Sequence, residues 1–209
     1  MFKKVLILAP HTDDGELGCG GTIAKLIEEG SEVYYAAFSV CELSVRKGVP
    51  TNILEIEVKK ATKTLGIKPE NLYLYPYKVR TFSDSRQSIL DDLIKLRELL
   101  KPDLILLPSS RDIHQDHQTI TNEGIRAFKM FTVLGYEMIW NNLSFDAQAF
   151  FVLEERHILR KIEALRCYES QNHRNYMKED FIRGMATARG VQIGEKFAEG
   201  FEVIRLINK

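Results

Sequence analysis

Two short clusters of histidine and carboxylate side chains are the residues of this sequence best suited to chemistry. The first, at 11–14, reads His-Thr-Asp-Asp and follows the apolar run 5–9. The second, at 114–117, reads His-Gln-Asp-His and follows the apolar run 104–107. Polar groups at the end of a buried strand lose hydration, which costs free energy unless these groups bind a partner. Both clusters are therefore candidate ligand-binding loops.

The side chains in the two clusters are those of a metal site. Neutral imidazole nitrogen and carboxylate oxygen are ordinary Zn²⁺ ligands, and a catalytic site needs three protein ligands and an open position. We expect His11, Asp14 and His117 to supply these three ligands. A His₂Asp set also suits Fe²⁺, so Zn²⁺ is the expected ion and Fe²⁺ the alternative.

Three polar residues of the clusters remain for catalysis. Asp13 adjoins a ligand but should point elsewhere, so it is the candidate base that takes a proton from water. His114 is the candidate donor to a tetrahedral oxyanion, and keeping it protonated would need a nearby carboxylate. Asp116 is expected to orient either His114 or a ligand histidine.

Two simpler interpretations compete with a metal site. An Asp-Asp pair after a strand often only caps the next helix and interacts with its dipole. The glycines at 18–21 could form a dinucleotide loop, but they do not fit GxGxxG, and Asp13, Asp14 and Glu16 before them would repel a pyrophosphate. Two clusters at corresponding positions of one sheet favour the metal, with Glu16 as a support or helix-start residue.

The elements that must position these clusters alternate between strand and helix. This alternation predicts an α/β, Rossmann-like, doubly wound and mostly parallel sheet in three layers, α/β/α. Right-handed crossovers would place all loops that follow the strands at one edge of the sheet. The expected strands are 5–9, 32–38, 72–75 and 104–107, and the expected helices are 22–29, 52–65, 87–100 and 118–130.

The alternation weakens after residue 131. We expect two further strands, of which the first could be antiparallel, then two helices separated by a polar stretch at 169–180 and a final extended segment. The expected strands are 136–140 and 148–152, the helices 154–168 and 181–189, and the last segment 201–207.

The composition describes one domain over residues 1–209, without a nucleic-acid or membrane signature. Lys plus Arg and Asp plus Glu number 29 each, so the net charge of +0 gives no support for binding nucleic acid. No apolar run approaches the length of a membrane span. Cys19, Cys41 and Cys167 are far apart and odd in number, which is typical of a reducing compartment, so we expect a cytoplasmic protein.

The two motifs, in this order, resemble the LmbE/PIG-L family of zinc-dependent N-deacetylases. The first motif spans 10–22 and the second is His114-Gln115-Asp116-His117. The resemblance implies an N-acetylated sugar as the small-molecule substrate, such as an N-acetylglucosamine conjugate. Relatives often assemble, so the resemblance also allows a homo-oligomer. The implied roles are zinc ligands for His11, Asp14 and His117, base for Asp13, oxyanion donor for His114, and its neighbour for Asp116.

The sequence departs from the family at two places. Thr12 stands where most relatives have proline. Proline stiffens a loop, so threonine is expected to loosen it without removing a chemical group. Relatives of the bacillithiol and mycothiol pathways usually carry Arg-x-x-Glu after the second strand, and here Leu54 precedes Glu57 at that spacing. The second departure argues against those two substrates and leaves other amidosugars open.

The loops 39–51, 76–86 and 169–180 are expected to select the substrate. Two other functions remain alternatives: a metal-dependent phosphoesterase, which would usually need two metal ions, and a non-catalytic sugar-binding module. The candidate substrate contacts in and beside the loops are Arg46, Arg80, Arg86 and His173.

Overall fold

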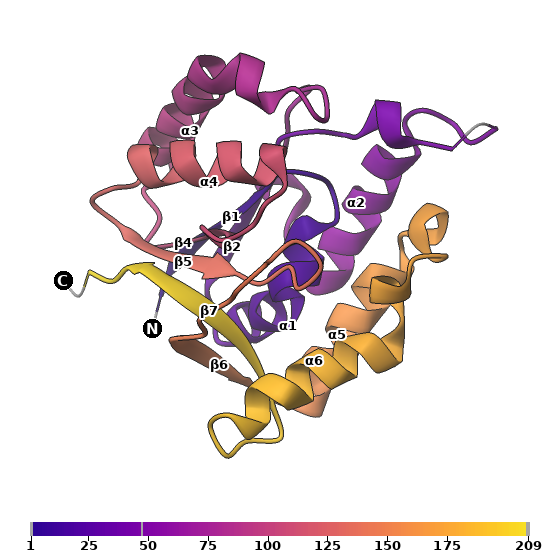
Figure 1. Ribbon diagram of the computed structural model, residues 1–209, viewed down its shortest axis with the longest axis vertical. Helices are drawn as coiled ribbons and strands as arrows, with labels where there is room; N and C mark the ends of the chain where they lie inside the picture. The colour runs from indigo at the N-terminus through magenta and orange to yellow at the C-terminus, as the bar shows by residue number, and fades with distance from the viewer. Residues whose placement is uncertain (1, 47, 208–209) are drawn as a thin grey trace.

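A mostly parallel sheet lies at the centre of the fold (Figure 1). The computed structural model describes residues 2–46 and 48–207. Within these residues the sheet has seven strands in the order β3-β2-β1-β4-β5-β7-β6. Strands β1 to β5 are parallel, and β7 runs antiparallel to β5 and β6. The strands are β1 (Lys4–Ala9), β2 (Glu32–Ala37), β3 (Leu72–Leu74), β4 (Leu104–Pro108), β5 (Thr132–Tyr136), β6 (Ala149–Leu153) and β7 (Phe197–Arg205).

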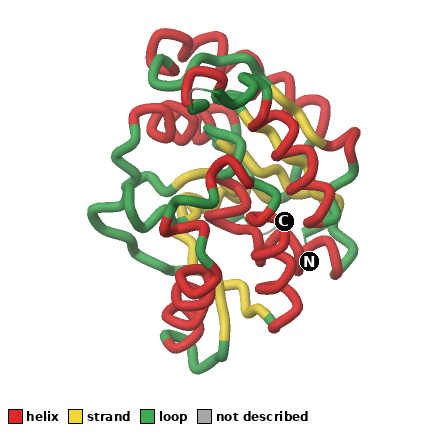
Figure 2. The backbone as a smooth tube through the Cα atoms, turned by 90° about the vertical axis from the view of Figure 1, so that its right-hand side faces the viewer, coloured by secondary structure: helices red, strands yellow, loops and turns green. Residues whose placement is uncertain are grey.

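Helices cover both faces of the sheet, as Figure 2 shows. Helices α3 and α4 pack on one face, and α1, α2, α5 and α6 lie on the other. This arrangement confirms the predicted α/β fold with a mostly parallel sheet flanked by helices. The helices are α1 (Asp14–Glu28), α2 (Ile53–Leu65), α3 (Arg86–Leu100), α4 (Gln115–Ala127), α5 (Glu155–Arg166) and α6 (Glu179–Val191). None of the helices in the described residues has the length and apolar character needed to cross a bilayer.

The central strand β1 explains why the apolar run 5–9 shows no alternation. Val5 and Ile7 belong to the core on the α1 side, whereas Leu6 and Leu8 belong to the core on the α3 and α4 side. All four side chains are fully buried. A strand covered on both faces needs apolar residues at every position.

The structure differs from the sequence-based boundaries around both clusters. Helix α1 begins at Asp14 rather than at residue 22, and α4 begins at Gln115 rather than at 118, so His117 lies in the first turn of a helix. Glycine is a poor helix former, which is why residues 14–21 do not read as helical. Glycine is nevertheless required in this helix, because a Cβ atom on Gly18 would overlap the ring of Tyr136.

The chain after residue 131 also differs from the prediction. The strand expected at 136–140 lies at Thr132–Tyr136 and is parallel to β4, so residues 137–148 form a loop. The antiparallel strand of this region is β7, which begins at Phe197 and therefore four residues before the expected segment. The apolar residues at 138–140 misled the prediction because Met138 is buried in the loop itself.

A buried ion pair joins the two halves of α1, which is interrupted at Cys19 (φ −147°). The Glu199 carboxylate accepts hydrogen bonds from the N–H groups of Gly21 (3.1 Å) and Thr22 (2.7 Å), at the start of the second half. The Lys161 ammonium donates to the Leu17 carbonyl and to Glu199, both at 2.7 Å. The pair thus satisfies the backbone groups that the interruption leaves without helical partners.

Substitution of Glu199 tests this account. Glu199→Ala leaves Lys161 as an uncompensated buried charge, so we expect the free energy of unfolding to fall by about 3–5 kcal/mol. Urea unfolding followed by circular dichroism measures the change. Glu98→Ala is the control, because the Glu98 side chain is 69% exposed and should change stability by less than about 0.5 kcal/mol. Equal effects of the two substitutions would contradict a structural role for the pair.

Candidate active site

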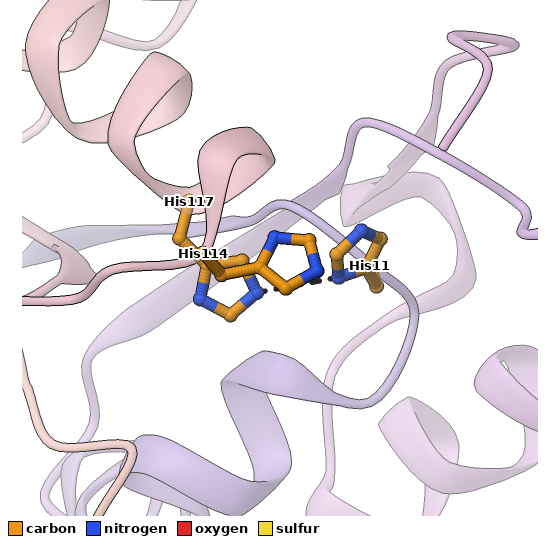
Figure 3. Close-up of side chains that lie close together, drawn as sticks. All are labelled: His11, His114 and His117. Atoms are coloured by element: carbon orange, nitrogen blue, oxygen red, sulfur yellow. Dashed lines mark hydrogen bonds between the residues drawn. The ribbon is translucent and has the colours of Figure 1, made fainter. Parts of the chain in front are cut away.

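The carboxyl ends of β1 and β4 bring the two polar clusters together. The two strands are direct neighbours, with Ile7 opposite Leu106. His11 follows β1, and His117 lies in the first turn of α4 after the β4 loop. Their rings meet, with His11 Nδ1 3.3 Å from His117 Nε2, and Figure 3 shows His114 beside them. The sheet therefore closes the long sequence separation between the two motifs.

Three atoms of His11, Asp14 and His117 form a nearly equilateral triangle. His11 Nδ1 is 3.1 Å from Asp14 Oδ2, His117 Nε2 is 3.2 Å from the same oxygen, and the two nitrogens are 3.3 Å apart. Ligand atoms about 2.0–2.1 Å from a tetrahedral ion would lie about 3.3–3.4 Å from one another. The triangle therefore has the dimensions of three corners of a metal site.

His114 is the other residue that could bind a cation here. Ring nitrogens of His11, His114 and His117 lie within 4.8 Å of one another, so the three histidines could also hold a metal ion. The set that contains Asp14 is tighter and includes a negative charge. In addition, His114 Nδ1 accepts a hydrogen bond from the Asp116 N–H (3.2 Å) and caps α4. The geometry favours Asp14 over His114 as the third ligand.

Buried carboxylates contact the outer nitrogens of both ligand histidines. His11 Nε2 lies 3.1 Å from Asp116 Oδ2, and His117 Nδ1 lies 2.7 Å from Asp112 Oδ2. Such contacts hold each proton on the outer nitrogen, so that His11 offers Nδ1 and His117 offers Nε2 to a cation. We expected Asp116 to orient His114 or a ligand histidine, and its carboxylate contacts the ligand histidine His11.

Sequence analysis missed Asp112. This residue accepts hydrogen bonds from His117 and from the His114 N–H (2.8 Å). A signal was available, because a metal-binding histidine usually has a carboxylate or carbonyl partner and Asp112 lies five residues before His117.

Asp116 also ties the site to the loop after β3. Its carboxylate accepts hydrogen bonds from the N–H groups of Arg80 (2.6 Å) and Phe82 (3.3 Å). Arg80 adopts a left-handed backbone conformation (φ 69°), which is unfavourable for a residue with a side chain. The hydrogen bond to Asp116 helps to hold this conformation, and the loop in turn orients the carboxylate on His11.

The charges of the triangle favour protons or a cation. Burial opposes protonation of His11, but Asp14 and Asp116 outweigh it and raise the pKa of His11 to about 9. Burial has the same effect on His117, and Asp14 and Asp112 raise its pKa to about 10. Burial opposes ionisation of Asp14, yet His117 and His11 hold its pKa well below the usual value. A metal ion would replace the protons on the inner nitrogens.

Asp13 and His114 line the cleft above the triangle. Burial, together with the charge of Asp14, raises the pKa of Asp13 to about 6, which is close to the optimum for a general base at neutral pH. Burial and the charges of His117 and His11 lower the pKa of His114. The ring of His114 is therefore neutral, and because Nδ1 is an acceptor, its proton lies on Nε2. Keeping His114 protonated would need a nearby carboxylate, and the charges of Asp116 and Asp14 are outweighed here by burial and by His117 and His11.

A buried polar network holds the loop at 11–14 from below. The hydroxyls of Tyr35 and Tyr168 lie 2.9 Å and 2.7 Å from the Thr12 carbonyl, and both also contact the Glu16 carboxylate. Burial raises the pKa of Glu16 to about 8. These contacts restrain the loop where relatives use proline. Glu16 lies beneath the loop rather than in the ligand triangle.

The triangle opens into a cleft with a cavity volume of about 310 Å³. Of the four candidate substrate contacts, only Arg80 lines it. Arg86 forms an ion pair with Glu123 (2.6 Å), and Arg46 and His173 are exposed outside the lining. Residues that the sequence analysis did not single out as contacts also line the cleft, among them Leu54, Trp140, Gln171, Arg174 and Tyr176.

The lining also bears on the second departure from the family pattern. Leu54, which replaces the arginine of the Arg-x-x-Glu pattern, is buried in the cleft wall, so the substitution removes a charge from that wall. Gln171, Arg174 and Tyr176 come from the stretch 169–180, which we expected to help select the substrate. Its polar composition was the available signal, but it did not indicate which side chains would face the cleft.

Comparison with known proteins gives consistent matches. The family model described as "PIG-L: GlcNAc-PI de-N-acetylase" matches residues 6–128. The chain is 29% identical to an uncharacterized deacetylase of Escherichia coli K12, over 80% of this chain and 91% of that protein. It is 24% identical to the diacetylchitobiose deacetylase of Thermococcus kodakarensis, over 97% of this chain and 83% of that protein. The structure of the N,N'-diacetylchitobiose deacetylase from Pyrococcus horikoshii superposes with a TM-score of 0.81 and 23% identity, covering 97% of this chain and 84% of that one, which shows a shared fold.

Removal of a triangle residue should abolish metal binding. Wild-type protein loaded with Zn²⁺ and dialysed should retain about one ion per chain, as one set of three ligands predicts. His117→Ala should retain little, because two ligands hold an ion weakly. Elemental analysis measures the content, and His173→Ala, at an exposed histidine outside the cleft, is the matched control. Full occupancy in His117→Ala would remove this residue from the site.

Asp112→Asn tests the contact behind His117. The substitution keeps the shape of the side chain but removes the charge that orients the imidazole, so we expect metal affinity to fall by about 10–100-fold. Competition with a chromophoric chelator measures the affinity. Asp146→Asn, an exposed position in the 137–148 loop, should bind the metal like the wild type. Wild-type affinity in Asp112→Asn would show that the contact does not tune the ligand.

Proposed function

We propose that this protein, which belongs to the PIG-L family, is a zinc-dependent N-deacetylase. Its substrate is an N-acetylated sugar, an N-acetylglucosamine-type conjugate, and its products are acetate and the free amino sugar. The observation that carries the proposal is the triangle of His11, Asp14 and His117, with Asp13 and His114 beside it in one cleft. The names of the similar deacetylases support the same reaction.

His11, Asp14 and His117 would hold the ion through Nδ1, Oδ2 and Nε2. A zinc ion supplies Lewis acidity toward the amide carbonyl and toward water. Asp112 and Asp116 keep the two imidazoles in the tautomers that binding requires. The donor set also suits Fe²⁺, so metal reconstitution belongs in the assay.

Asp13 acts as the proton carrier in this proposal. Its carboxylate accepts a proton as a water molecule attacks the acetyl carbon, and it then donates that proton to the amine nitrogen when the C–N bond breaks. Atoms and charges balance, since amide and water become acetic acid and amine. A pKa of about 6 suits both transfers, because Asp13 is ionised at pH 7 and its conjugate acid is still strong enough to protonate a leaving amine.

His114 stabilises the developing negative charge. Its Nε2–H group donates a hydrogen bond to the carbonyl oxygen as this oxygen becomes an oxyanion. The hydrogen bond from the Asp116 N–H to Nδ1 fixes the ring and keeps the proton on Nε2. A neutral donor does this without adding a second positive charge beside the cation.

The alternatives fit the site less well. A phosphoesterase usually needs two metal ions about 3.5–4 Å apart with more ligands than one triangle supplies. A non-catalytic sugar-binding module would not need a base at Asp13 and a hydrogen-bond donor at His114. Parallel assays of acetate and phosphate release separate the two hydrolases, and sugar binding without acetate release would identify the binding module.

We also propose that residues 1–209 act as one deacetylase domain in the cytoplasm. The three cysteines are free, which supports a reducing compartment. A cellular fractionation that found the protein outside the cytoplasm would contradict the proposed location.

Asp13→Asn tests the base. The amide cannot accept the proton, so the rate of acetate release from N,N'-diacetylchitobiose or N-acetylglucosamine 1-phosphate should fall by about 10²–10⁴-fold. The metal content should stay at the wild-type level, because Asp13 is outside the triangle. Asp91→Asn, at an exposed position on α3, is the matched control. A near-wild-type rate in Asp13→Asn would show that another group carries the proton.

A further inference from the structure

Three side chains form a layered wall on one side of the cleft. The rings of Trp140 and Tyr176 stack with their centroids 4.1 Å apart and an interplanar angle of 13°. The Arg174 guanidinium lies over the Tyr176 ring, 5.6 Å from its centroid. All three residues line the cleft. The wall joins the loop at 137–148 to the segment at 169–180, so both segments can position Arg174.

A chain of hydrogen bonds fixes Arg174 from behind. Its Nε donates to Gln171 Oε1 (2.7 Å), and the Gln171 amide donates to the Ser170 hydroxyl (3.1 Å). The Ser170 N–H and hydroxyl both donate to the Glu57 carboxylate, at 2.9 Å and 2.6 Å. Glu57 and Gln171 are buried. The guanidinium is therefore held at Nε and by its contact with Tyr176, in a position where its charge faces the cleft.

Among the described residues Arg174 forms no ion pair, and its charge favours the ionised form of Asp13. Across residues 2–46 and 48–207, neither the Arg174 nor the Arg80 guanidinium forms an ion pair with a carboxylate, although the Arg80 backbone N–H donates to Asp116, and both arginines line the cleft. Most other arginines form ion pairs with carboxylates, namely Arg86, Arg97, Arg126, Arg156, Arg160, Arg166, Arg183 and Arg189. Arg46, Arg111 and Arg205 form none in the described part of the chain, but they are exposed and outside the cleft lining. A positioned guanidinium without a counter-ion suits two-point recognition of a carboxylate or phosphate.

We propose that Arg174 anchors an anionic group, a carboxylate or a phosphate, of the sugar conjugate whose acetamide enters the triangle. The inference rests on the proposed deacetylase function and adds the class of conjugate. Arg80 adds positive charge to the same cleft. Asp14 would be neutralised by the cation that it binds, so Asp13 is the remaining acidic side chain among the described residues that line the cleft. The Leu54 side of the cleft offers no charge, which leaves recognition of the anion to the arginines.

A matched pair of substrates tests the anchor. Acetate release is measured for the phenyl glycoside of N-acetylglucosamine and for its 4-carboxyphenyl counterpart, with N-acetylglucosamine 1-phosphate as the phosphate arm. Wild-type kcat/KM should be about 10–100-fold higher for the preferred anion than for the neutral glycoside. Arg174→Gln should lose this preference, so that its kcat/KM falls more for the anionic substrates than for the neutral glycoside. Arg174→Lys should retain part of the preference, because it keeps the charge but not the fork.

Arg205→Gln is the matched control, because Arg205 is an exposed arginine at the end of β7 and outside the cleft lining. Its preference for the anionic substrates should equal that of the wild type. Acetate release with no preference for an anion, or an equal loss on all substrates in Arg174→Gln, would overturn the anchor while leaving the deacetylase function intact. The carboxylate and phosphate arms show which anion the site takes.

A binding measurement separates this inference from the proposed function. Isothermal titration calorimetry compares N-acetylglucosamine 1-phosphate with the methyl glycoside on wild type and Arg174→Gln. If no substrate releases acetate, the deacetylase proposal fails, yet tighter binding of the phosphate that disappears in Arg174→Gln would still support the anchor. Equal binding of the two compounds to wild-type protein would overturn it.

Discussion

The parallel pairing of β1 with β4 is the constraint on which the rest of the structure depends. It places the residues that follow Ala9 beside the residues that follow Pro108, so that His11 Nδ1 and His117 Nε2 lie 3.3 Å apart. The pairing is secured by apolar burial on both faces of β1, a strand that contributes to two separate cores. Because the triangle tolerates little displacement, the cores and the site depend on the same packing.

The site concentrates like charges at a cost that a cation offsets. Asp14, Asp112 and Asp116 are buried together, and the pKa values of His11 and His117 are raised to about 9 and 10 by these carboxylates. Buried charges are tolerated where they are paired and hydrogen-bonded. Asp112 and Asp116 contact the outer nitrogens of the ligand histidines, whereas Asp14 Oδ2 accepts a hydrogen bond from the His11 backbone N–H (2.8 Å) and faces the two inner nitrogens that a cation would share. The surrounding electrostatics thus support one location for an ion.

The residues proposed for chemistry and the proposed anion anchor come from different parts of the chain. The residues of the triangle, Asp13 and His114 lie within 6–128, the part matched by the family model. The layered wall of Trp140, Tyr176 and Arg174 lies outside it. The later part also supplies Lys161 and Glu199, which stabilise the interruption in α1. The proposed catalytic centre thus lies in the part of the chain that the family model matches, and the proposed anion anchor lies after it.

The sequence by itself determined the sheet class, the two motifs and their assignment to one sheet edge, because apolar runs and the order of parallel strands are local and topological properties. Tertiary structure decided the start of α1 at Asp14, the geometry of the Asp112 contact with His117, the neutral state of His114 and the position of Arg174 in the cleft. Each of these depends on a neighbour in space: Tyr136 against Gly18, a carboxylate within reach of an imidazole, or Gln171 behind a guanidinium. The Gly18 contact joins segments far apart in the chain, and the Asp112 and Gln171 contacts are local but depend on how their loops fold, which periodicity does not encode.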